Sequence, residues 1–257
     1  MNIVILCGGL GTRLSEETNV KPKPMVEIGG KPILWHIMKV YEKYNFNNFI
    51  LALGYKGEVI KDYFLNYHSL QSNITINLQS GNINYSNPTA ENWNISMIDT
   101  GAKTMTGGRL LRLKSLLHEG GTFMLTYGDG LSDINIDDLL SFHKLHGKVA
   151  TVTAVRPPVR FGELSIDKDK VVKFQEKPQA GEGWINGGFF VFEPEIFNLI
   201  QNDETLLERE PLEHLANRGE LMTYKHEGFW QCMDTIRDRD NLNNIFESGL
   251  TPWLKTK

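Results

Sequence analysis

Short apolar runs alternate with helical patterns over the first part of the chain. Ile3–Cys7, Asn48–Leu53 and Thr122–Tyr127 are largely apolar, which is typical of buried strands. Elsewhere apolar residues recur every three or four positions, which predicts helices. These helices are expected at residues 32–41, Gly57–Phe64, Thr106–Leu117 and Ile136–His146. Strands that alternate with helices build parallel β-α-β units, so the pattern predicts a doubly wound α/β fold with a mostly parallel sheet.

The pattern changes near residue 149, where strand-like segments follow one another with short polar breaks. These strands are expected at Val149–Val155, Glu163–Ile166, Val171–Gln175 and Ile185–Phe192. A last helix is expected near Ile236–Phe246. We therefore expect one domain over residues 1–257, in which a β-rich part, about 149–257, adds strands to a core of about 1–148 and makes the sheet mixed.

One stretch inside the core part lacks a regular pattern. Ile74–Leu78 has the pattern of a short strand, whereas Ser80–Asn94 is rich in Asn and Ser. Long polar stretches between regular elements are usually loops with a function of their own or insertions. We therefore expect a mobile or inserted loop over Ser80–Asn94.

Composition narrows the class of protein. Hydrophobic residues are 40% of the 257 and charged residues 23%, so the chain can bury a core without disulfides or structural metals. The formal net charge of −4 argues against nucleic acid as a partner, but not against a small nucleotide. From the sequence we expect no membrane span and no signal peptide, and its two cysteines cannot build a disulfide framework. We expect a cytoplasmic enzyme.

A glycine-rich loop, Gly8-Gly9-Leu10-Gly11-Thr12-Arg13, follows the first strand. Glycines let the backbone N–H groups approach a phosphate closely, and the arginine fork matches phosphate oxygens. Leu14 stands where the dinucleotide fingerprint has its third glycine, and the Gly-Lys-Ser/Thr ending of a Walker A loop is absent. A tight strand-to-helix turn is the alternative, but the Thr-Arg pair directly after the glycines favours phosphate binding.

A basic, proline-rich segment, Lys21-Pro22-Lys23-Pro24-Met25, comes shortly after this loop. Prolines stiffen the backbone and fix the direction of the lysines, one of which could neutralise a triphosphate. Such a run taken alone is more often a solvated loop. Its closeness to the glycine loop favours a role at the phosphates.

Two aspartates are candidate metal ligands. Asp129 follows the strand Thr122–Tyr127, and Asp234 lies in the segment 228–235. Carboxylates suit Mg²⁺, which prefers oxygen ligands and keeps several waters. The alternatives are a turn aspartate between glycines for Asp129 and the N-cap of the following helix for Asp234. Spacing in the sequence leaves these alternatives open.

The β-rich part holds weaker candidates. Lys177 could bind a sugar phosphate, and Glu176 and Asn186 could bond sugar hydroxyls, whereas a hairpin turn and a glycine kink are the alternatives. We interpret His143 and His146 as surface residues, because no cysteine or carboxylate completes a zinc pattern around them.

Cys7–Leu14 together with Lys21–Met25 resembles the signature of the sugar-1-phosphate nucleotidyltransferases. Residues 105–109, 126–130, 186–189 and 229–235 extend the resemblance to the CTP-using branch of this family, over nearly the whole chain. The resemblance implies a Rossmann-like nucleotidyltransferase fold in which the β-rich part binds the sugar. It also implies a homo-oligomer.

The resemblance implies a role for each matching residue. Those expected at the nucleotide are Leu6, Cys7, Gly8, Gly9, Leu10, Gly11, Thr12, Arg13, Lys23, Thr104, Arg109 and Gly128. Those expected at the sugar phosphate are Glu176, Lys177 and Asn186, and Asp129 and Asp234 are expected to hold Mg²⁺. The catalytic residues would be Arg13, Lys23, Asp129 and Lys177.

The implied reaction is cytidylyl transfer from CTP to α-D-glucose 1-phosphate, which yields CDP-glucose and pyrophosphate. In this family CDP-glucose commonly feeds the synthesis of surface polysaccharide. One alternative is the same reaction with UTP, dTTP or ATP, or with another sugar 1-phosphate. A second is a nucleotide-sensing module without turnover.

Overall fold

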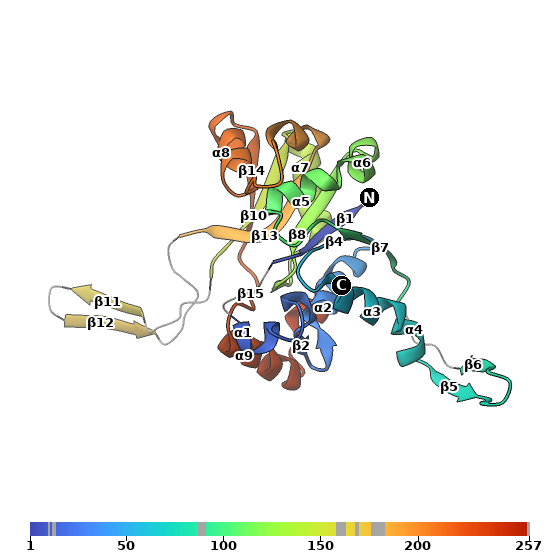
Figure 1. Ribbon diagram of the computed structural model, residues 1–257. Helices are drawn as coiled ribbons and strands as arrows, with labels where there is room; N and C mark the ends of the chain where they lie inside the picture. The colour runs from blue at the N-terminus through green and yellow to red at the C-terminus, as the bar shows by residue number, and fades with distance from the viewer. Residues whose placement is uncertain are drawn as a thin grey trace.

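A mixed sheet lies at the centre of the molecule (Figure 1). The computed structural model describes residues 1–9, 11, 14–86, 91–157, 163–167, 170–175 and 183–255. In this part of the chain the sheet has seven strands in the order β14-β10-β13-β8-β1-β4-β7. Their bounds are β1 Ile3–Cys7, β4 Asn48–Leu53, β7 Asn94–Asp99, β8 Phe123–Tyr127, β10 Ala150–Val155, β13 Ile185–Phe192 and β14 Leu221–His226.

Most neighbouring strands of this sheet run parallel. β1 is parallel to β4 and β8, β4 to β7, and β10 to β14, whereas β13 is antiparallel to both β10 and β8. The predicted α/β fold with a mostly parallel mixed sheet is confirmed. Cys7 pairs with Leu53, and Leu6 pairs with Tyr127. The carboxyl ends of three central strands therefore meet at one edge, where α/β sheets bind their ligands.

Helices cover both faces of the sheet. They are α1 Ser15–Thr18, α2 Ile33–Glu42, α3 Gly57–Leu65, α4 Tyr67–Leu70, α5 Thr106–Arg112, α6 Lys114–Leu117, α7 Ile136–His146, α8 Glu210–Asn217 and α9 Ile236–Glu247. Short 3₁₀ helices are η2 Lys23–Met25, η3 His118–Gly120, η4 Pro194–Leu199 and η5 Pro252–Leu254. None of the helices in the described ranges is both long and apolar enough to cross a bilayer.

Burial on both faces explains why the central strands are continuously apolar. Ile3, Ile5 and Cys7 belong to an apolar cluster that includes residues of α2, α3, α7 and α9. Val4 and Leu6, which point the other way, belong to a second cluster with residues of α5, α6 and α8. Successive side chains of a strand point to opposite faces of the sheet. When helices cover both faces, nearly every side chain of the strand is buried, and the sequence is apolar throughout.

Four short strands pair outside the central sheet and shape the site. β2 Glu27–Ile28 pairs with β3 Lys31–Pro32, and β9 Gly130–Ser132 pairs with β15 Trp230–Cys232. Cys232 is the partner of Gly130 in the second pair. This pairing brings the segment after β8 beside a segment that is about one hundred residues later in the chain.

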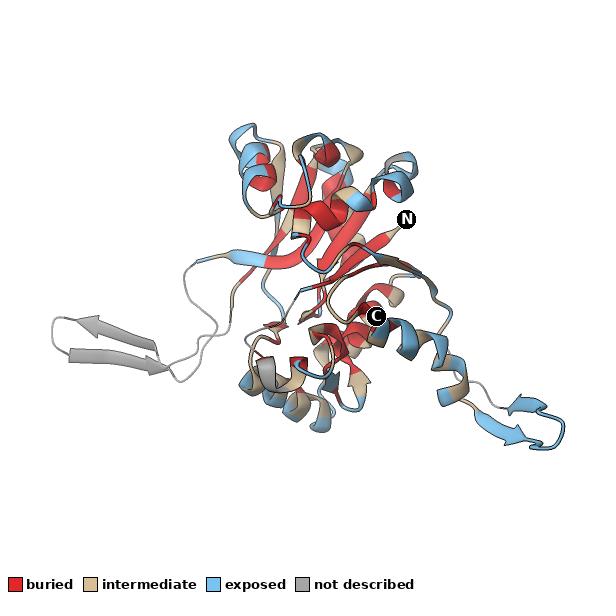
Figure 2. Cartoon of the chain, in the orientation of Figure 1, coloured by how far each residue is buried: buried red, intermediate tan, exposed pale blue. Residues whose placement is uncertain are grey.

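Two further strand pairs form hairpins. β5 Asn73–Ile76 pairs with β6 Ile83–Ser86, and β11 Glu163–Asp167 pairs with β12 Lys170–Gln175. The β5–β6 hairpin projects from the body of the molecule and is exposed along its length (Figures 1 and 2). The prediction of a loop over Ser80–Asn94 is wrong for Ile83–Ser86 and Asn94, which belong to β6 and to the edge strand β7. Residues 87–90 of this stretch lie outside the described residues.

Other predictions need correction as well. The helix predicted over Thr106–Leu117 is interrupted at Leu113, between α5 and α6. β14 was not predicted, because its sequence Leu-Met-Thr-Tyr-Lys-His is that of a half-exposed edge strand. The interpretation of His143 as a surface residue is wrong, since its side chain is 1% exposed. It bonds Thr151 and Glu193 inside the protein.

Candidate active site

A cavity of about 360 Å³ opens at the carboxyl edge of β1 and β8. Residues predicted for the site that line it are Leu6, Cys7, Gly8, Gly9, Gly11, Lys23, Thr104, Arg109, Gly128, Asp129 and Asp234. Lining residues that were not predicted as site residues are Pro24, Met105, Thr106, Tyr127 and Leu206. Leu10, Thr12 and Arg13 lie outside the described residues. The strand ends thus bring together segments from both parts of the sequence.

Two glycines of the loop, Gly8 and Gly11, are needed for steric reasons. Gly11 has a φ of +61°, and a Cβ there would lie 2.8 Å from Cγ2 of Thr18. The Thr18 hydroxyl donates to the carbonyl oxygen of Gly11 at 3.0 Å, and the Leu14 N–H donates to the same oxygen at 2.9 Å. The backbone of the loop is therefore held from one side by α1.

Arg109 holds the loop from the other side. This side chain is only 4% exposed, and it donates hydrogen bonds to the carbonyl oxygens of Gly8 at 2.9 Å, Leu53 at 3.0 Å and Gly101 at 2.8 Å. A Cβ on Gly8 would lie 2.1 Å from the guanidinium carbon. Burial lowers the pKa of Arg109 below its ordinary value. The guanidinium thus ties the ends of β1 and β4 together and also lines the cavity.

Lys23 lies between two carboxylates. Its Nζ donates to Oδ2 of Asp129 at 2.6 Å and to Oδ1 of Asp234 at 2.5 Å. Burial alone would lower the pKa of Lys23, but Asp129 and Asp234 outweigh burial and the pKa is raised. Pro24, directly after Lys23, is buried, and a Cβ on Gly128 would lie 3.0 Å from its Cγ. The proline-rich segment is therefore packed against the strand end, and the alternative of a solvated loop does not hold for Lys23.

The backbone explains why the two aspartates meet. Besides the β9–β15 pairing, the Met233 N–H donates to the carbonyl oxygen of Asp129 at 2.8 Å. The N-cap of α9 is Thr235, which forms a capping box with Asp238. Asp234 therefore does not cap the helix, and its carboxylate points to Lys23 instead.

The two carboxylates fit a hard divalent cation. They converge on one ammonium group, and both are partly exposed to the cavity. Mg²⁺ is commonly held by one or two carboxylates and completes its shell with waters and substrate phosphates. Among the described residues, no group of three His, Cys, Asp or Glu side chains could hold a metal ion. Asp129 and Asp234 would thus supply the described protein ligands.

A broader cavity of about 1270 Å³ adjoins the first, and Tyr127, Asp129 and Asp234 line both. Asn186, predicted to meet the sugar, donates through Nδ2 to the Tyr127 hydroxyl at 3.1 Å. Its Oδ1 accepts the N–H of Gly188 at 2.8 Å. Glu176 and Lys177, the other predicted sugar ligands, lie outside the described residues.

Two glycines of α5 let a distant segment form part of the wall. A Cβ on Gly107 would lie 2.7 Å from the carbonyl oxygen of Thr205, and one on Gly108 would lie 2.4 Å from that of Asp203. The Met105 N–H donates to the Asp203 carbonyl at 2.8 Å. Segment 203–207 therefore packs backbone to backbone against α5 and brings Leu206 to the cavity.

Comparisons with known proteins agree with this architecture. A family model for nucleotidyl transferase matches residues 2–235. The chain is 53% identical over 253 residues to glucose-1-phosphate cytidylyltransferase of Salmonella typhi, which covers 98% of both chains. It is 46% identical over 254 residues to the probable glucose-1-phosphate cytidylyltransferase of Bacillus subtilis, which covers 98% of this chain and 99% of the relative. The structure of HddC from Yersinia pseudotuberculosis matches 95% of this chain and 99% of its own, with a TM-score of 0.70 at 25% identity.

Proposed function

This chain belongs to the nucleotidyl transferase family, and we propose that it transfers the cytidylyl group of CTP to α-D-glucose 1-phosphate, giving CDP-glucose and pyrophosphate. The observation that carries the proposal is the 53% identity, over 98% of the chain, to the Salmonella typhi enzyme of that name. The cavity lined by Lys23, Asp129 and Asp234 supports the proposal. Its lysine could bind phosphate groups, and its two converging carboxylates could hold a divalent cation that binds phosphates as well.

The reaction needs no nucleophile from the protein. The phosphate of the sugar substrate loses its second proton with a pKa of about 6, so its oxygen is ionised near neutral pH. This oxygen forms a bond to the α-phosphorus of CTP, and the bond to the bridging oxygen breaks in line, so that pyrophosphate leaves with the electron pair. The barrier is electrostatic, because two anions approach and negative charge builds on the leaving group.

The chain supplies positive charge and donors for both anions. We assign Lys23 and the backbone N–H groups of Gly8, Gly9 and Gly11 to the triphosphate, because these four residues line the same cavity. Arg13 and Lys177 are assigned by resemblance to the leaving pyrophosphate and to the sugar phosphate. Asp129 and Asp234 would hold Mg²⁺, which when bound supplies positive charge to the phosphates.

We assign the two parts of the chain to the two substrates. Residues 1–148 carry the glycine loop, Thr104 and Arg109, and would hold the nucleotide. Residues 149–257 carry Glu176, Lys177 and Asn186 and would hold the sugar phosphate. Asp234 and Leu206 come from the second part and line the first cavity, so the site needs both parts. We propose that the enzyme acts in the cytoplasm.

Pyrophosphate release tests the proposal directly. CTP, UTP, dTTP, ATP and GTP are each combined with several sugar 1-phosphates, with and without Mg²⁺. We expect the highest kcat/KM for CTP with glucose 1-phosphate, loss of activity with a chelator and recovery with Mg²⁺. A higher kcat/KM for another pair would show that this pair, and not CTP with glucose 1-phosphate, is the pair of substrates. Nucleotide binding without any pyrophosphate release would instead support the sensing module.

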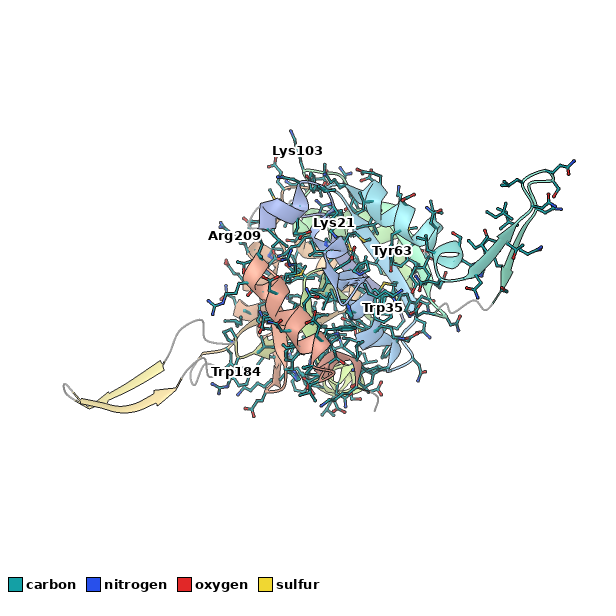
Figure 3. The ribbon with its side chains drawn as sticks, turned by 90° about the horizontal axis from the view of Figure 1, so that it is seen from below. Lys21, Trp35, Tyr63, Lys103, Trp184 and Arg209 are labelled. Carbon is teal, nitrogen blue, oxygen red and sulfur yellow. The ribbon has the colours of Figure 1, made fainter. Side chains whose placement is uncertain are left out.

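We propose that the enzyme is a homo-oligomer built through the β5–β6 hairpin. Ile74 pairs with Tyr85 and Ile76 with Ile83, so all four side chains share one face of the hairpin. Each of them is 42–52% exposed, and Leu78 near the tip is 91% exposed. The side chains of this hairpin extend into solvent away from the body (Figure 3). A two-stranded hairpin is marginally stable alone, so an uncovered apolar face requires a partner surface.

We propose a second copy of the chain as the partner that covers the apolar face of the hairpin. The residues from 71 to 86 include no charged side chain, so two copies of the face can meet without repulsion. Most soluble oligomers are symmetric assemblies of one chain. Ile76→Thr with Ile83→Thr keeps the strand propensity but removes apolar surface, and we expect a smaller sedimenting species.

The matched control for this experiment changes the opposite face. Thr75 and Asn84 form the neighbouring cross-strand pair, whose side chains point away from the apolar face. Thr75→Ser with Asn84→Thr should leave the assembly intact. An unchanged species in the Ile76 and Ile83 variant, or a wild-type monomer, would contradict the proposal.

A further inference from the structure

Glu208 bonds two side chains that line the cavities but lines neither cavity itself. It lies between η4 and α8, directly before Arg209, which is labelled in Figure 3. Its Oε2 accepts the Thr106 hydroxyl at 2.6 Å, and its Oε1 accepts the Tyr127 hydroxyl at 2.7 Å. One carboxylate therefore joins the first residue of α5 to the last residue of β8.

The direction of each hydrogen bond in this network is determined by its chemistry. The Leu207 N–H donates to the Thr106 hydroxyl at 2.9 Å, and Asn186 donates to the Tyr127 hydroxyl. Both hydroxyls thus accept one bond and donate their proton to Glu208. An ionised carboxylate, which only accepts, satisfies two donors at once, whereas an amide offers one oxygen. Burial, followed by the negative charge of Glu208, raises the pKa of Tyr127, so this hydroxyl keeps its proton.

The network spans both cavities. Thr106 lines the first, and Tyr127 lines both. The ring of Tyr127 also packs closely against Gly188. A Cβ on Gly188 would lie 2.6 Å from Cδ2 of Tyr127, so there is no free space on that side of the ring. Packing therefore limits the ring, and Glu208 fixes the hydroxyl at its end. Side chains fixed by packing and by hydrogen bonds from behind hold substrates in place more accurately than mobile ones do.

We propose that Glu208 is a positioning residue that holds Tyr127 and Thr106 as the common wall of the nucleotide and sugar sites. The inference rests on the proposed function, because it assigns the two cavities to the two substrates. Through Thr106 the carboxylate orients the nucleotide side, and through Tyr127 and Asn186 it orients the sugar side. A small misplacement of either reactant slows in-line transfer strongly.

Three substitutions separate the two halves of the network. Tyr127→Phe removes the hydroxyl on the sugar side, and we expect it to raise KM for glucose 1-phosphate about tenfold with a smaller effect on CTP. Thr106→Val should raise KM for CTP more than KM for the sugar phosphate. Glu208→Gln should raise both, because its one oxygen cannot accept from both hydroxyls.

A double-mutant cycle distinguishes positioning from general destabilisation. Glu208→Gln combined with Tyr127→Phe should lower kcat/KM for glucose 1-phosphate hardly more than either change alone, because both remove the same hydrogen bond. Glu204→Gln is the matched control, since this exposed carboxylate lies on the same segment and should leave both KM values unchanged. Melting temperatures of all variants show whether the proteins are folded.

The outcomes are distinct. Wild-type KM values in Glu208→Gln, or additive effects in the cycle, would overturn this inference while the proposed function stands. So would Tyr127→Phe and Thr106→Val variants that each change the KM values of both substrates alike. Absence of pyrophosphate release in the wild-type enzyme with every pair of substrates would overturn the proposed function, and this inference with it.

Discussion

Two polar networks lie at opposite ends of the same strands and differ in kind. At the carboxyl end of β8, Lys23 joins Asp129 and Asp234 beside the cavities. At the amino end of β8, His143 joins Thr151 and Glu193 within the protein. β13 is antiparallel to β8, with Phe192 paired to Phe123, so Glu193 falls at that amino end. The first network faces a cavity, whereas the second lines neither cavity. We call the second the enclosed network because His143 and Thr151 at its centre are buried, although its Glu193 carboxylate is 33% exposed.

The enclosed network satisfies its own donors and acceptors. The Lys148 N–H donates to Nδ1 of His146 at 2.9 Å, so Nε2 of His146 carries the proton and donates to the Thr151 hydroxyl at 2.7 Å. That hydroxyl donates to Nδ1 of His143 at 2.8 Å, and Nε2 of His143 donates to Glu193 at 3.1 Å. A chain of hydrogen bonds around buried side chains contributes to stability, and none of its residues lines either cavity.

The charged network of Lys23, Asp129 and Asp234 differs because it can bind a ligand. Its two carboxylates keep part of their surface open to the cavities, at 29% and 22% exposed, where they can bind a cation. The networks also respond to pH with opposite signs. A raised lysine pKa means stability that is lost at high pH, and a lowered histidine pKa means stability that is lost at low pH.

The largest effect is expected at the charged network. Lys23→Ala and Asp129→Asn should each lower kcat by about a hundredfold or more. The first removes positive charge that faces the reacting phosphates, and the second removes one of the two carboxylates that would hold Mg²⁺. Both should keep the fold, since the carboxylates remain in contact with solvent in the cavity. Steady-state kinetics and thermal melting measure the two quantities.

Lys21→Ala is the matched control for this prediction. Lys21 lies on the same proline-rich segment, but its partners are Glu27 at 3.3 Å and Glu17 at 4.0 Å. Such surface ion pairs contribute little. We expect near wild-type turnover in this variant. Turnover close to wild type in Lys23→Ala as well would show that the charged network is structural, and the contrast with the enclosed network would fail.

The fold was predictable where burial leaves a pattern in the sequence. Strands such as Ile3–Cys7 are apolar throughout because helices cover both faces. The hairpin was not predictable, because Ile74 and Ile76 alternate with polar residues just as in a half-buried strand of a sheet. Periodicity shows that a strand has an apolar face, but not what covers that face.

The charged residues of the site were predictable in part. Asp129 follows a strand whose end lies at the ligand-binding edge, Lys23 lies close to the glycine loop in the sequence, and the resemblance to the family added the role of Asp234. Lys23, Asp129 and Asp234 were inferred as site residues, and backbone pairing brings the last two together. Glu208 was not inferred, because Tyr127 and Thr106 are 81 and 102 residues away from it and a lone glutamate in a polar segment has no local signature. The backbone bonds of Arg109 were missed for the same reason.

A smaller effect is expected at the enclosed network, and on stability alone. Thr151→Val leaves Nδ1 of His143 and the Nε2 proton of His146 without a partner, so it should lower the free energy of unfolding by about 2 kcal/mol. The kcat should stay within about twofold of wild type, because the network lies at the far end of the sheet. Chemical denaturation and the pyrophosphate assay measure the two effects.

β10 offers a close control for this substitution. Thr153 lies on the same strand and is fully buried, but its hydroxyl has no hydrogen-bond partner in the described structure. Thr153→Val replaces the hydroxyl by a methyl group of similar size, as Thr151→Val does, but breaks no hydrogen bond. We therefore expect no loss of stability. Equal losses in both valine variants would mean that the hydrogen bonds of Thr151 contribute nothing.

The smallest effect is gradual and depends on pH. Burial lowers the pKa of His143, and burial lowers the pKa of His36 to about 4. His36 donates from Nε2 to the Ile28 carbonyl at 2.8 Å and accepts the Trp253 N–H at 3.2 Å, so both of its nitrogens serve the neutral form. Below the unfolded pKa of about 6.5, the unfolded chain binds protons that the folded chain refuses. Stability is therefore complete above that pH and falls as the pH drops towards 4.

For His36 alone, this shift predicts a loss of about 2 kcal/mol in the free energy of unfolding between pH 7 and pH 5. Urea unfolding at several pH values measures it. His36→Gln should be less stable at pH 7 and lose less on acidification, whereas the same change at the exposed His214 should follow the wild-type curve. If His36→Gln kept the full wild-type slope, the acid sensitivity would have to come from other histidines with a lowered pKa, such as His143 and His146. The loss of stability at low pH would then belong to the enclosed network, which contains His143, and the loss at high pH to the charged network. The two ends of the sheet would thus differ in their response to pH.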